Sequence, residues 1–339
     1  MGTRKERYWS KSRRRIAKYA SHISHDRVII KINGKMRDLV EDYIAYLRKL
    51  DKKENLKYTS KNIKIYSKQW NQFRRKHITA CHLKRILFWN ERSPYLYKCI
   101  TKYISGNNPN RGILLEGLIL DILRKNGYTV KYINELWVHK YLPWLSCTSD
   151  GVIVNNDRFV AAVEIKTFTS SINFHNTIEI TPDGKSLKQN TRIYFQVQAI
   201  AEIIDVPYVV FIYEFKGVVD KMLVDRDLDF IWRYHELIKE RYFKHIIPFY
   251  LYGIPKNIDK NKKKKISYFS DNIYQRLMVV LEKRQEDYGY CEEDSFFHYY
   301  PDIKPSEVYN TYFEMFTDIE QITRLKHDPL LHNKLIDCL

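Results

Sequence analysis

Residues 146–168, with the sequence SCTSDGVIVNNDRFVAAVEIKTF, decide how this chain is interpreted. Two apolar runs rich in β-forming residues, 152–154 and 159–165, lie on either side of the polar cluster Asn-Asn-Asp at 155–157. Two such runs around a turn cluster are typical of a β-hairpin. We therefore predict two antiparallel strands joined by a short turn.

Asp150, Glu164 and Lys166 are the charged residues of this stretch that suggest a chemical role. Alternate side chains of a strand share a face, so Glu164 and Lys166 are expected on one side and Ile165 on the other. The backbone carbonyl of Ile165 then faces the side of Glu164 and Lys166. Asp150 precedes Gly151, which permits a sharp turn of the backbone. Two carboxylates and a carbonyl form a hard-oxygen set suited to Mg²⁺, with Mn²⁺ as a second option.

This combination of groups suits the hydrolysis of phosphodiesters. A divalent cation lowers the pKa of a bound water and neutralises charge on the phosphate. Lys166 beside the cation would orient the attacking water or stabilise the developing charge. The alternative is a surface hairpin with an incidental Glu-x-Lys pair, but unpaired charge in so apolar a run as residues 160–165 is costly to bury. The pattern resembles that of the PD-(D/E)xK nucleases.

The charge of the chain is large and unevenly distributed. The 339 residues carry a formal net charge of +18. Residues 1–80 contain 23 Lys and Arg against 7 Asp and Glu, whereas residues 281–339 contain 6 against 13. A basic half of this size favours a polyanionic partner, and we predict nucleic acid, with a membrane surface as the lesser alternative.

The cysteine pattern and the hydropathy indicate the compartment. The five cysteines are scattered and form no CxxC pair, which argues against a disulfide framework or a zinc site and for a reducing environment. The chain has no apolar run of about 18 residues, and its start lacks the apolar core of a signal peptide. We expect an intracellular protein without a membrane segment, in a host nucleus or a cytoplasmic viral replication site.

Periodicity along the chain predicts three regions. These are a basic, mainly helical N-terminal extension at 1–65, a nuclease core at 66–250 and a C-terminal helical region at 251–339. The region after Asn33-Gly34, up to residue 50, is predicted to be helical. Within the core, apolar stripes predict helices at 109–127, 190–205 and 226–247, and β-forming runs predict strands at 128–132, 136–139 and 207–213.

Two further residues of the core have functional interpretations. Arg74 lies before a helix that Thr79 is expected to cap, and both guanidinium groups and helix-end amides bind phosphate. Glu116 lies between leucines near the start of the helix at 109–127. A carboxylate in that place is paired, protonated or metal-bound, unless it lies at the edge of the stripe and is favoured by the helix dipole. Position alone favours neither interpretation of Glu116.

Five spaced motifs over roughly residues 69–215 resemble those of the lambda-type exonucleases, also called the YqaJ-like viral recombinase or alkaline exonuclease group. They occur in the same order as in that family. The motifs are Trp70-x-x-x-Arg74 with Ile78-Thr79-Ala80-Cys81, Gly112-x-x-x-Glu116, Cys147-Thr148-Ser149-Asp150-Gly151, Glu164-x-Lys166 and Gln196-Val197-Gln198.

The resemblance implies an α/β (α+β) fold of restriction-endonuclease-like type, with a central mixed sheet flanked by helices. It implies Mg²⁺-dependent 5′→3′ digestion of linear duplex DNA. Partners in that family include single-strand annealing proteins, and some members form trimers. The implied roles are metal ligation by Asp150 and Glu164, action on a metal or its water by Glu116, catalysis by Lys166, positioning by Gln196, and 5′-phosphate binding by Arg74 with Thr148 as a helper.

Two positions depart from the family pattern. Cys81 replaces a serine that helps to hold the 5′-phosphate, and this puts dependence on a DNA end in doubt. Ser149 replaces a proline, which we expect to have little effect. The leading hypothesis is a viral or mobile-element DNA exonuclease for recombination, repair or genome processing. The alternatives are a structure-specific endonuclease or an RNA-acting nuclease on the same core, and a catalytically silent DNA-binding protein.

Overall fold

The structure is a computed structural model, and it describes a defined part of the chain. The described residues are 27–54, 70, 74–93, 96–97, 110–131, 133–139, 142, 144–155, 158–182, 184–254 and 265–284. Residues 1–26 of the predicted N-terminal extension lie outside these residues, as does most of the predicted C-terminal helical region. Among the described residues, none of the helices has the length and apolar character needed to span a bilayer.

A five-stranded mixed sheet carries the hairpin that the sequence predicts. Its strand order is β12-β11-β8-β7-β4. β8 pairs antiparallel with β7 and parallel with β11, and the two outer pairs are antiparallel. The prediction of a mixed α/β fold is therefore confirmed. The strands are β4 (Thr129–Lys131), β7 (Gly151–Asn155), β8 (Arg158–Phe168), β11 (Tyr208–Phe215) and β12 (Val218–Asp225).

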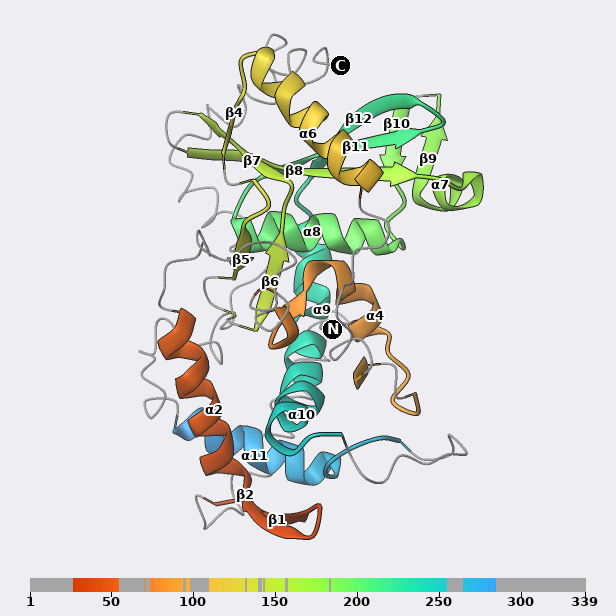
Figure 1. Cartoon of the computed structure of the whole chain (residues 1–339). Coiled ribbons are helices and arrows are strands. Elements are labelled where there is room, and N and C mark those ends of the chain that lie inside the picture. The colour runs from red at the N-terminus through yellow and green to blue at the C-terminus, as the bar shows by residue number, and fades with distance from the viewer. Residues whose placement is uncertain are drawn as a thin grey trace, which may run out of the picture. The chain divides into compact units, whose positions relative to one another are not determined.

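Two helices, α6 (Asn110–Lys125) and α8 (Arg192–Ile204), lie on either side of this sheet (Figure 1). On one side, buried apolar residues of α6 pack with alternate residues of β8, including Val163 and Ile165. On the other side, Gln196 of α8 contacts Glu164. The alternation along β8 therefore places Ile165 in the apolar core and Glu164 toward α8, as the strand period predicts.

A three-stranded sheet in the order β3-β6-β5 leads into the same region. β3 (Ile78–Thr79) pairs parallel with β6 (Leu145–Thr148), and β5 (Leu136–Val138) pairs antiparallel with β6. The 3₁₀-helix η1 (Ala80–His82) and the helix α4 (Leu83–Leu87) follow β3 directly. Because β6 runs into the Asp150 corner, this sheet brings the segment around Arg74 near the predicted carboxylates.

Further elements follow the central strands. A short helix and a second hairpin come after β8, and a longer helix comes after β12. They are α7 (Ser171–Thr177), β9 (Ile178–Thr181), β10 (Gly184–Leu187) and α9 (Leu228–Arg241). The side-chain oxygen of Ser170 caps α7, and that of Thr191 caps α8. Both caps satisfy amides that the first helical turn leaves unpaired.

The N-terminal elements correct one prediction. The stretch after Asn33-Gly34 begins as a strand, so that β1 (Ile29–Ile32) and β2 (Lys35–Asp38) form a hairpin before α2 (Leu39–Glu54) starts. Asn33 and Gly34 both have positive φ, at 50° and 84°, as the tight turn of a two-residue hairpin requires. The remaining elements are the π-helix η2 (Tyr242–Ile246), α10 (Ile247–Tyr252) and α11 (Asp271–Lys283).

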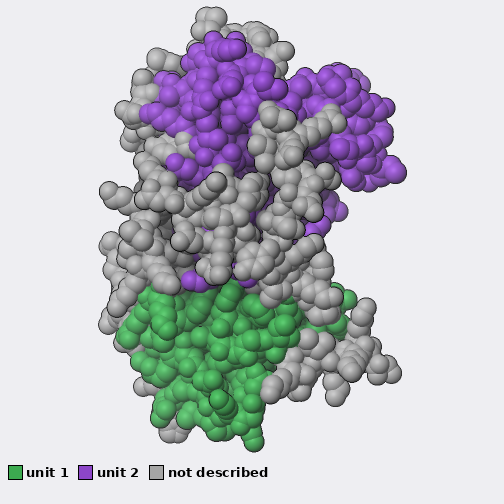
Figure 2. Space-filling model, viewed as in Figure 1, with its two compact units in different colours: residues 1–55, 89–100, 239–301 green, residues 56–88, 101–238, 302–339 purple. Residues whose placement is uncertain are grey.

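The chain divides into two compact units, which Figure 2 distinguishes by colour. Unit 1 consists of residues 1–55, 89–100 and 239–301, and unit 2 consists of residues 56–88, 101–238 and 302–339. The predicted domain boundaries at 65 and 250 stay a prediction. All residues that the sequence predicts for catalysis, metal binding or phosphate binding belong to unit 2.

Candidate active site

Glu164 is the centre of a buried polar cluster on β8. Its side chain is only 1% exposed. Its Oε1 accepts hydrogen bonds from Lys166 Nζ and Gln196 Nε2. Its other oxygen, Oε2, is also buried and has no hydrogen-bond partner among the residues that the structure describes. A buried carboxylate oxygen without a donor is costly, so this atom is suited to a ligand.

Asp150 is fixed beside Glu164 by the backbone of β8. Its Oδ2 accepts a hydrogen bond of 2.6 Å from Ile165 N, and its own amide donates to Val163 O at 3.0 Å. The following Gly151 is required by packing, because a Cβ there would lie 2.8 Å from Val130 Cγ1. The Asp-Gly corner thus brings a carboxylate against the strand that carries Glu164 and Lys166.

Lys166 joins the carboxylate to the strand backbone. Besides its contact with Glu164, its Nζ donates to Ile165 O at 3.2 Å. Burial by itself lowers the pKa of Lys166, but the carboxylates of Glu164 and Asp150 outweigh this and raise it above its usual value. Lys166 therefore stays protonated, and its charge faces the Glu164 carboxylate and the Ile165 carbonyl.

Glu116 on α6 lies within electrostatic range of this cluster. Burial and the charge of Asp150 together raise its pKa to about 7, against the opposing charge of Lys166. Within the described residues, no hydrogen bond joins the Glu116 carboxylate to Asp150, Glu164 or Lys166. The tertiary fold therefore brings Glu116 near Asp150 and Lys166, and its role at a metal or its water stays a prediction.

The three carboxylates carry more negative charge than Lys166 balances. Burial raises the pKa of Glu164 to about 8, with Lys166 opposing and Asp150 adding to the shift. Burial also raises the pKa of Asp150. The charge of Asp150 raises the pKa of both glutamates, and a cation bound among the three acids would relieve this repulsion.

The donor atoms fit a hard divalent cation. The residues that would hold it are Asp150 and Glu164, with the backbone carbonyl of Ile165, and the partnerless Oε2 of Glu164 is the observation that favours this. Across the described part of the chain, no three His, Cys, Asp or Glu side chains are grouped closely enough to form a complete metal site. Mg²⁺ commonly uses only one or two carboxylates and completes its shell with water and substrate phosphate.

A second polar cluster surrounds Cys81 in η1. Arg74 Nη2 donates to Cys81 Sγ at 3.0 Å, and the guanidinium carbon of Arg74 lies 4.2 Å from the ring centroid of Trp70. The charge of Cys81 contributes to the raised pKa of Glu164, so the two clusters are within electrostatic range of each other. The buried Oγ1 of Thr148 has no hydrogen-bond partner in the described part of the chain. The structure therefore pairs Arg74 with Cys81 and leaves Thr148 unconnected to them.

The sequence analysis did not assign site roles to three residues of the second cluster. Thr79 Oγ1 lies 3.3 Å from Cys81 Sγ and 3.0 Å from His82 Nδ1, and its side chain does not cap η1 as predicted. Arg192, at the start of α8, donates from Nε to Cys81 O at 2.9 Å. The only sequence signal for Arg192 is a basic residue directly after the Thr191 cap, which is too common to be specific.

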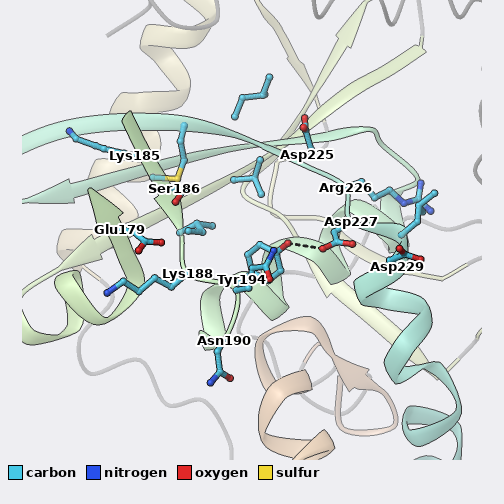
Figure 3. A pocket seen from close by; sticks show the side chains of 16 residues that line it. Glu179, Lys185, Ser186, Lys188, Asn190, Tyr194, Asp225, Arg226, Asp227 and Asp229 are labelled. Atoms are coloured by element: carbon cyan, nitrogen blue, oxygen red, sulfur yellow. Dashed lines mark hydrogen bonds between the residues drawn. The ribbon is translucent and has the colours of Figure 1, made fainter. Parts of the chain in front are cut away.

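A cavity of about 1190 Å³ lies among β10, β12 and the first residues of α8 and α9 (Figure 3). Lys185, Tyr194 and Asp227 are among its lining residues, and Tyr194 Oη donates to Asp227 Oδ2 at 3.1 Å. None of the predicted site residues lines this cavity. The carboxylate cluster is therefore a separate feature of unit 2.

Comparisons with known proteins give partial structural similarities. No family model matches the sequence, and no curated protein matches it. An alkaline exonuclease, LHK-Exo from Laribacter hongkongensis, is similar at 14% identity and a TM-score of 0.40 over 52% of this chain and 90% of that chain. The structure of LHK-Exo in complex with dAMP is similar at 13% identity and a TM-score of 0.40, over 65% and 99% of the two chains. The protein SSO0001 is similar at 16% identity and a TM-score of 0.31, over 59% and 84%.

Proposed function

We propose that this protein is a divalent-metal-dependent nuclease that hydrolyses phosphodiester bonds of DNA. One observation carries the proposal. The buried carboxylate of Glu164, held by Lys166 and Gln196, has an oxygen without a partner among the described residues. Asp150 lies within electrostatic range of Glu164, and Glu116 lies within electrostatic range of Asp150 and Lys166. A structural hairpin has no need of an aspartate that raises the pKa of two nearby glutamates, whereas such a group of acids suits a cation site facing phosphate.

Each residue of the cluster has a role that follows from its contacts. When bound, a divalent cation activates water and screens phosphate charge. Lys166 is protonated and stabilises negative charge that develops on the phosphate. Gln196 fixes the orientation of the Glu164 carboxylate, and the Ile165 amide fixes Asp150. Glu116, with a pKa of about 7, is suited to accept a proton from water near neutral pH.

The finer parts of the proposal rest on the ordered motifs and on charge. Arg74 would bind the 5′-phosphate of linear duplex DNA, since its guanidinium suits bidentate phosphate contacts. The strongly basic N-terminal part of the sequence suits a polyanion. With these motifs, 5′→3′ digestion with Mg²⁺ is the preferred activity, and viral or mobile-element recombination, repair or genome processing inside a cell is the preferred role. A single-strand annealing protein is the partner that these motifs favour.

A nuclease assay tests the proposal. The full-length protein is incubated with linear 5′-phosphorylated duplex DNA in Mg²⁺ or in EDTA, beside the variants Glu164→Ala and Lys166→Ala. Digestion is expected in Mg²⁺ alone and is expected to be lost in both variants. The matched control is Glu179→Ala, an exposed carboxylate on β9. Unchanged digestion by Glu164→Ala or Lys166→Ala would show that the assignment is wrong.

A covalently closed circle of the same sequence separates exonuclease from endonuclease activity. An enzyme that requires an end leaves the circle intact, whereas cleavage of the circle favours a structure-specific endonuclease. Salt-sensitive DNA binding without metal-dependent turnover would instead identify a catalytically silent DNA-binding protein.

A further inference from the structure

The sulfur of Cys81 takes the place that an anion would take at Arg74. Arg74 Nη2 lies 3.0 Å from Cys81 Sγ, and the ring of Trp70 holds the guanidinium from one face. The Sγ atom also lies 3.3 Å from Thr79 Oγ1 and 3.7 Å from His82 Nδ1. Several polar groups therefore converge on one sulfur atom that is only half-buried.

A second basic residue approaches Cys81 from another element. Arg192 Nε donates to the Cys81 carbonyl at 2.9 Å, from the first residue of the 13-residue helix α8. The N-terminus of such a helix also favours negative charge. The ionisable groups that interact electrostatically with the Cys81 thiol are Arg74, His82, the thiol of Cys147 and the carboxylate of Glu164, whereas Arg192 contacts the Cys81 backbone.

The balance of these groups favours the thiolate form. Burial raises the pKa of Cys81, but Arg74, His82 and the Thr79 hydroxyl outweigh it and lower the pKa to about 5. Cys147, which is 1% exposed on β6, shows the opposite behaviour, because burial raises the pKa of its thiol. Two described cysteines of one unit are thus expected to differ strongly in reactivity at neutral pH.

The neighbouring strand supplies an unused hydrogen-bonding group. Thr79 is in register with Ser146 in the parallel pair of β3 and β6, so their side chains lie on the same face. Thr79 Oγ1 points to Cys81 and His82 from that face. Ser146 is fully buried, and its Oγ finds no hydrogen-bond partner within the described ranges. Ser146 is therefore an unsatisfied hydroxyl, within the described ranges, on the strand face that also carries Thr79.

We propose that Cys81 is a reactive thiolate that serves as the resident counter-anion of Arg74, and that a terminal DNA phosphate binds Arg74 only by displacing it. This inference rests on the proposed function for the identity of the phosphate. A thiolate and a phosphate compete for one guanidinium, because two anions at that distance repel each other. The Arg74–Cys81 pair therefore weakens the binding of phosphorylated DNA ends. Cys81 is also a site of modification by soft electrophiles.

Alkylation of the full-length protein in EDTA tests the thiolate. The Cys81 sulfur attacks the methylene carbon of iodoacetamide, a sulfur–carbon bond forms, and iodide leaves. Mass spectrometry of the two peptides at about pH 6.5 is expected to show Cys81 reacting at least about tenfold faster than Cys147. Because Cys147 is also shielded by burial, the variant Arg74→Met provides the second comparison. Arg74→Met is expected to slow the alkylation of Cys81 by about tenfold at the same pH. Equal Cys81 rates with and without Arg74 overturn the proposal.

DNA ends test the displacement. Unlabelled duplex is added in EDTA at equal occupancy, with either a 5′-phosphate or a 5′-hydroxyl at its ends. The 5′-phosphorylated duplex is expected to change the alkylation rate of Cys81 at least threefold more than the 5′-hydroxyl duplex does. Identical effects of the two duplexes overturn the displacement. The alkylation without DNA does not depend on turnover, so failure of the nuclease assay and failure of the counter-anion are distinguishable.

The variant Cys81→Ser removes the competing charge and keeps a polar atom. It is expected to bind 5′-phosphorylated duplex about fivefold more tightly than the natural protein does, with unchanged affinity for 5′-hydroxyl duplex. Fluorescence anisotropy in EDTA measures both affinities. An affinity for the phosphorylated end that is equal or weaker in Cys81→Ser contradicts a competing role of the thiolate.

Discussion

Lys166 donates to the Glu164 carboxylate from two positions along β8, on the face that α8 covers. Glu164 is nearly inaccessible, whereas the Lys166 side chain is 30% exposed. The pair therefore consists of a buried acid and an ammonium group that reaches toward solvent. Because one lysine faces three acids, a bound cation would offset the remaining negative charge, and this expectation can be measured.

Glu164→Gln is expected to abolish DNA hydrolysis and to raise the melting temperature of the metal-free protein by a few degrees. The amide removes a charge that burial disfavours, as the raised pKa of Glu164 indicates. Mg²⁺ is expected to raise the melting temperature of the natural protein and to leave that of the variant unchanged. Differential scanning fluorimetry measures both effects, with Glu179→Gln as the exposed control. A Mg²⁺-dependent shift that survives in Glu164→Gln would remove Glu164 from the metal site.

Lys166→Met is expected to lower the turnover number by about a hundredfold to a thousandfold, with a smaller effect on DNA affinity. The ammonium charge is lost from the side of the carboxylates, so the pKa of Glu164 should rise further. The acidic limb of the pH profile of turnover should therefore move to higher pH, because the carboxylate must be ionised to bind the cation. Single-turnover kinetics at several pH values check this. A variant whose turnover is normal and whose pH profile is unmoved excludes a catalytic role for Lys166.

The concentration of Mg²⁺ for half-maximal activity is expected to fall as the pH rises from about 6 to about 9. The acids Glu116 and Glu164 have pKa values raised to about 7 and about 8, and protons compete with the cation for such carboxylates. The stability of the metal-free protein is expected to fall over the range of pH in which the affinity for Mg²⁺ rises. A carboxyl whose folded pKa is raised binds more protons in the folded state, so the metal-free protein should lose stability between about pH 4.5 and pH 8. Titration of activity with Mg²⁺, and urea unfolding in EDTA, measure the two trends.

Arg74→Lys is expected to remove most of the preference for a 5′-phosphate over a 5′-hydroxyl end. A lysine keeps the positive charge but lacks the planar fork that contacts two phosphate oxygens and stacks on Trp70. We expect KM for the phosphorylated end to rise by about tenfold with little change for the hydroxyl end. The control is Arg85→Lys, an exposed arginine of α4. An equal rise in KM for phosphorylated and hydroxyl ends would indicate a general role of Arg74 in DNA binding.

Glu202→Ala is expected to destabilise the protein by about 3–5 kcal/mol, because it leaves buried positive charge without its acid. Glu202 Oε1 lies 3.1 Å from His139 Nε2, and Oε2 accepts from Arg226 Nε at 3.1 Å. His139 is buried in this network. Glu202→Gln should lower the free energy of unfolding by less than Glu202→Ala does. Chemical unfolding measures both, and an unfolding free energy within 1 kcal/mol of the natural value for Glu202→Ala contradicts the prediction.

The same network should weaken in acid. Burial alone would raise the pKa of Glu202, but Arg226 and His139 outweigh it and lower the pKa far below its usual value. A depressed carboxyl pKa contributes its full stability above the unfolded value of about 4.3 and loses it as the pH falls below that value. The difference between the natural protein and Glu202→Gln should therefore shrink as unfolding is measured at decreasing pH below about 4.

Much of the local structure follows from the sequence. The turn cluster and the β-branched runs predict the β7–β8 hairpin, and apolar stripes predict α6 and α8. The strand after Asn33-Gly34 was missed, because the helical periodicity of the next segment extends back over it. The apolar residues of α8 also do not predict that Gln198 is buried. Its Nε2 donates to Asp225 O, so a residue distant in sequence satisfies the buried amide of Gln198.

The sequence by itself determined that Glu164 and Lys166 share a face of one strand and that Asp150 lies at a corner beside it. Those relations depend only on the two-residue period of a strand and on a nearby turn. Only the tertiary structure decided that Glu116 approaches Asp150, that Gln196 reaches Glu164, and that Arg74 meets Cys81. The physical reason is that each of these contacts joins elements distant in sequence, whose positions are set by the packing of α6 and α8 against the sheet and by the pairing of β3 with β6.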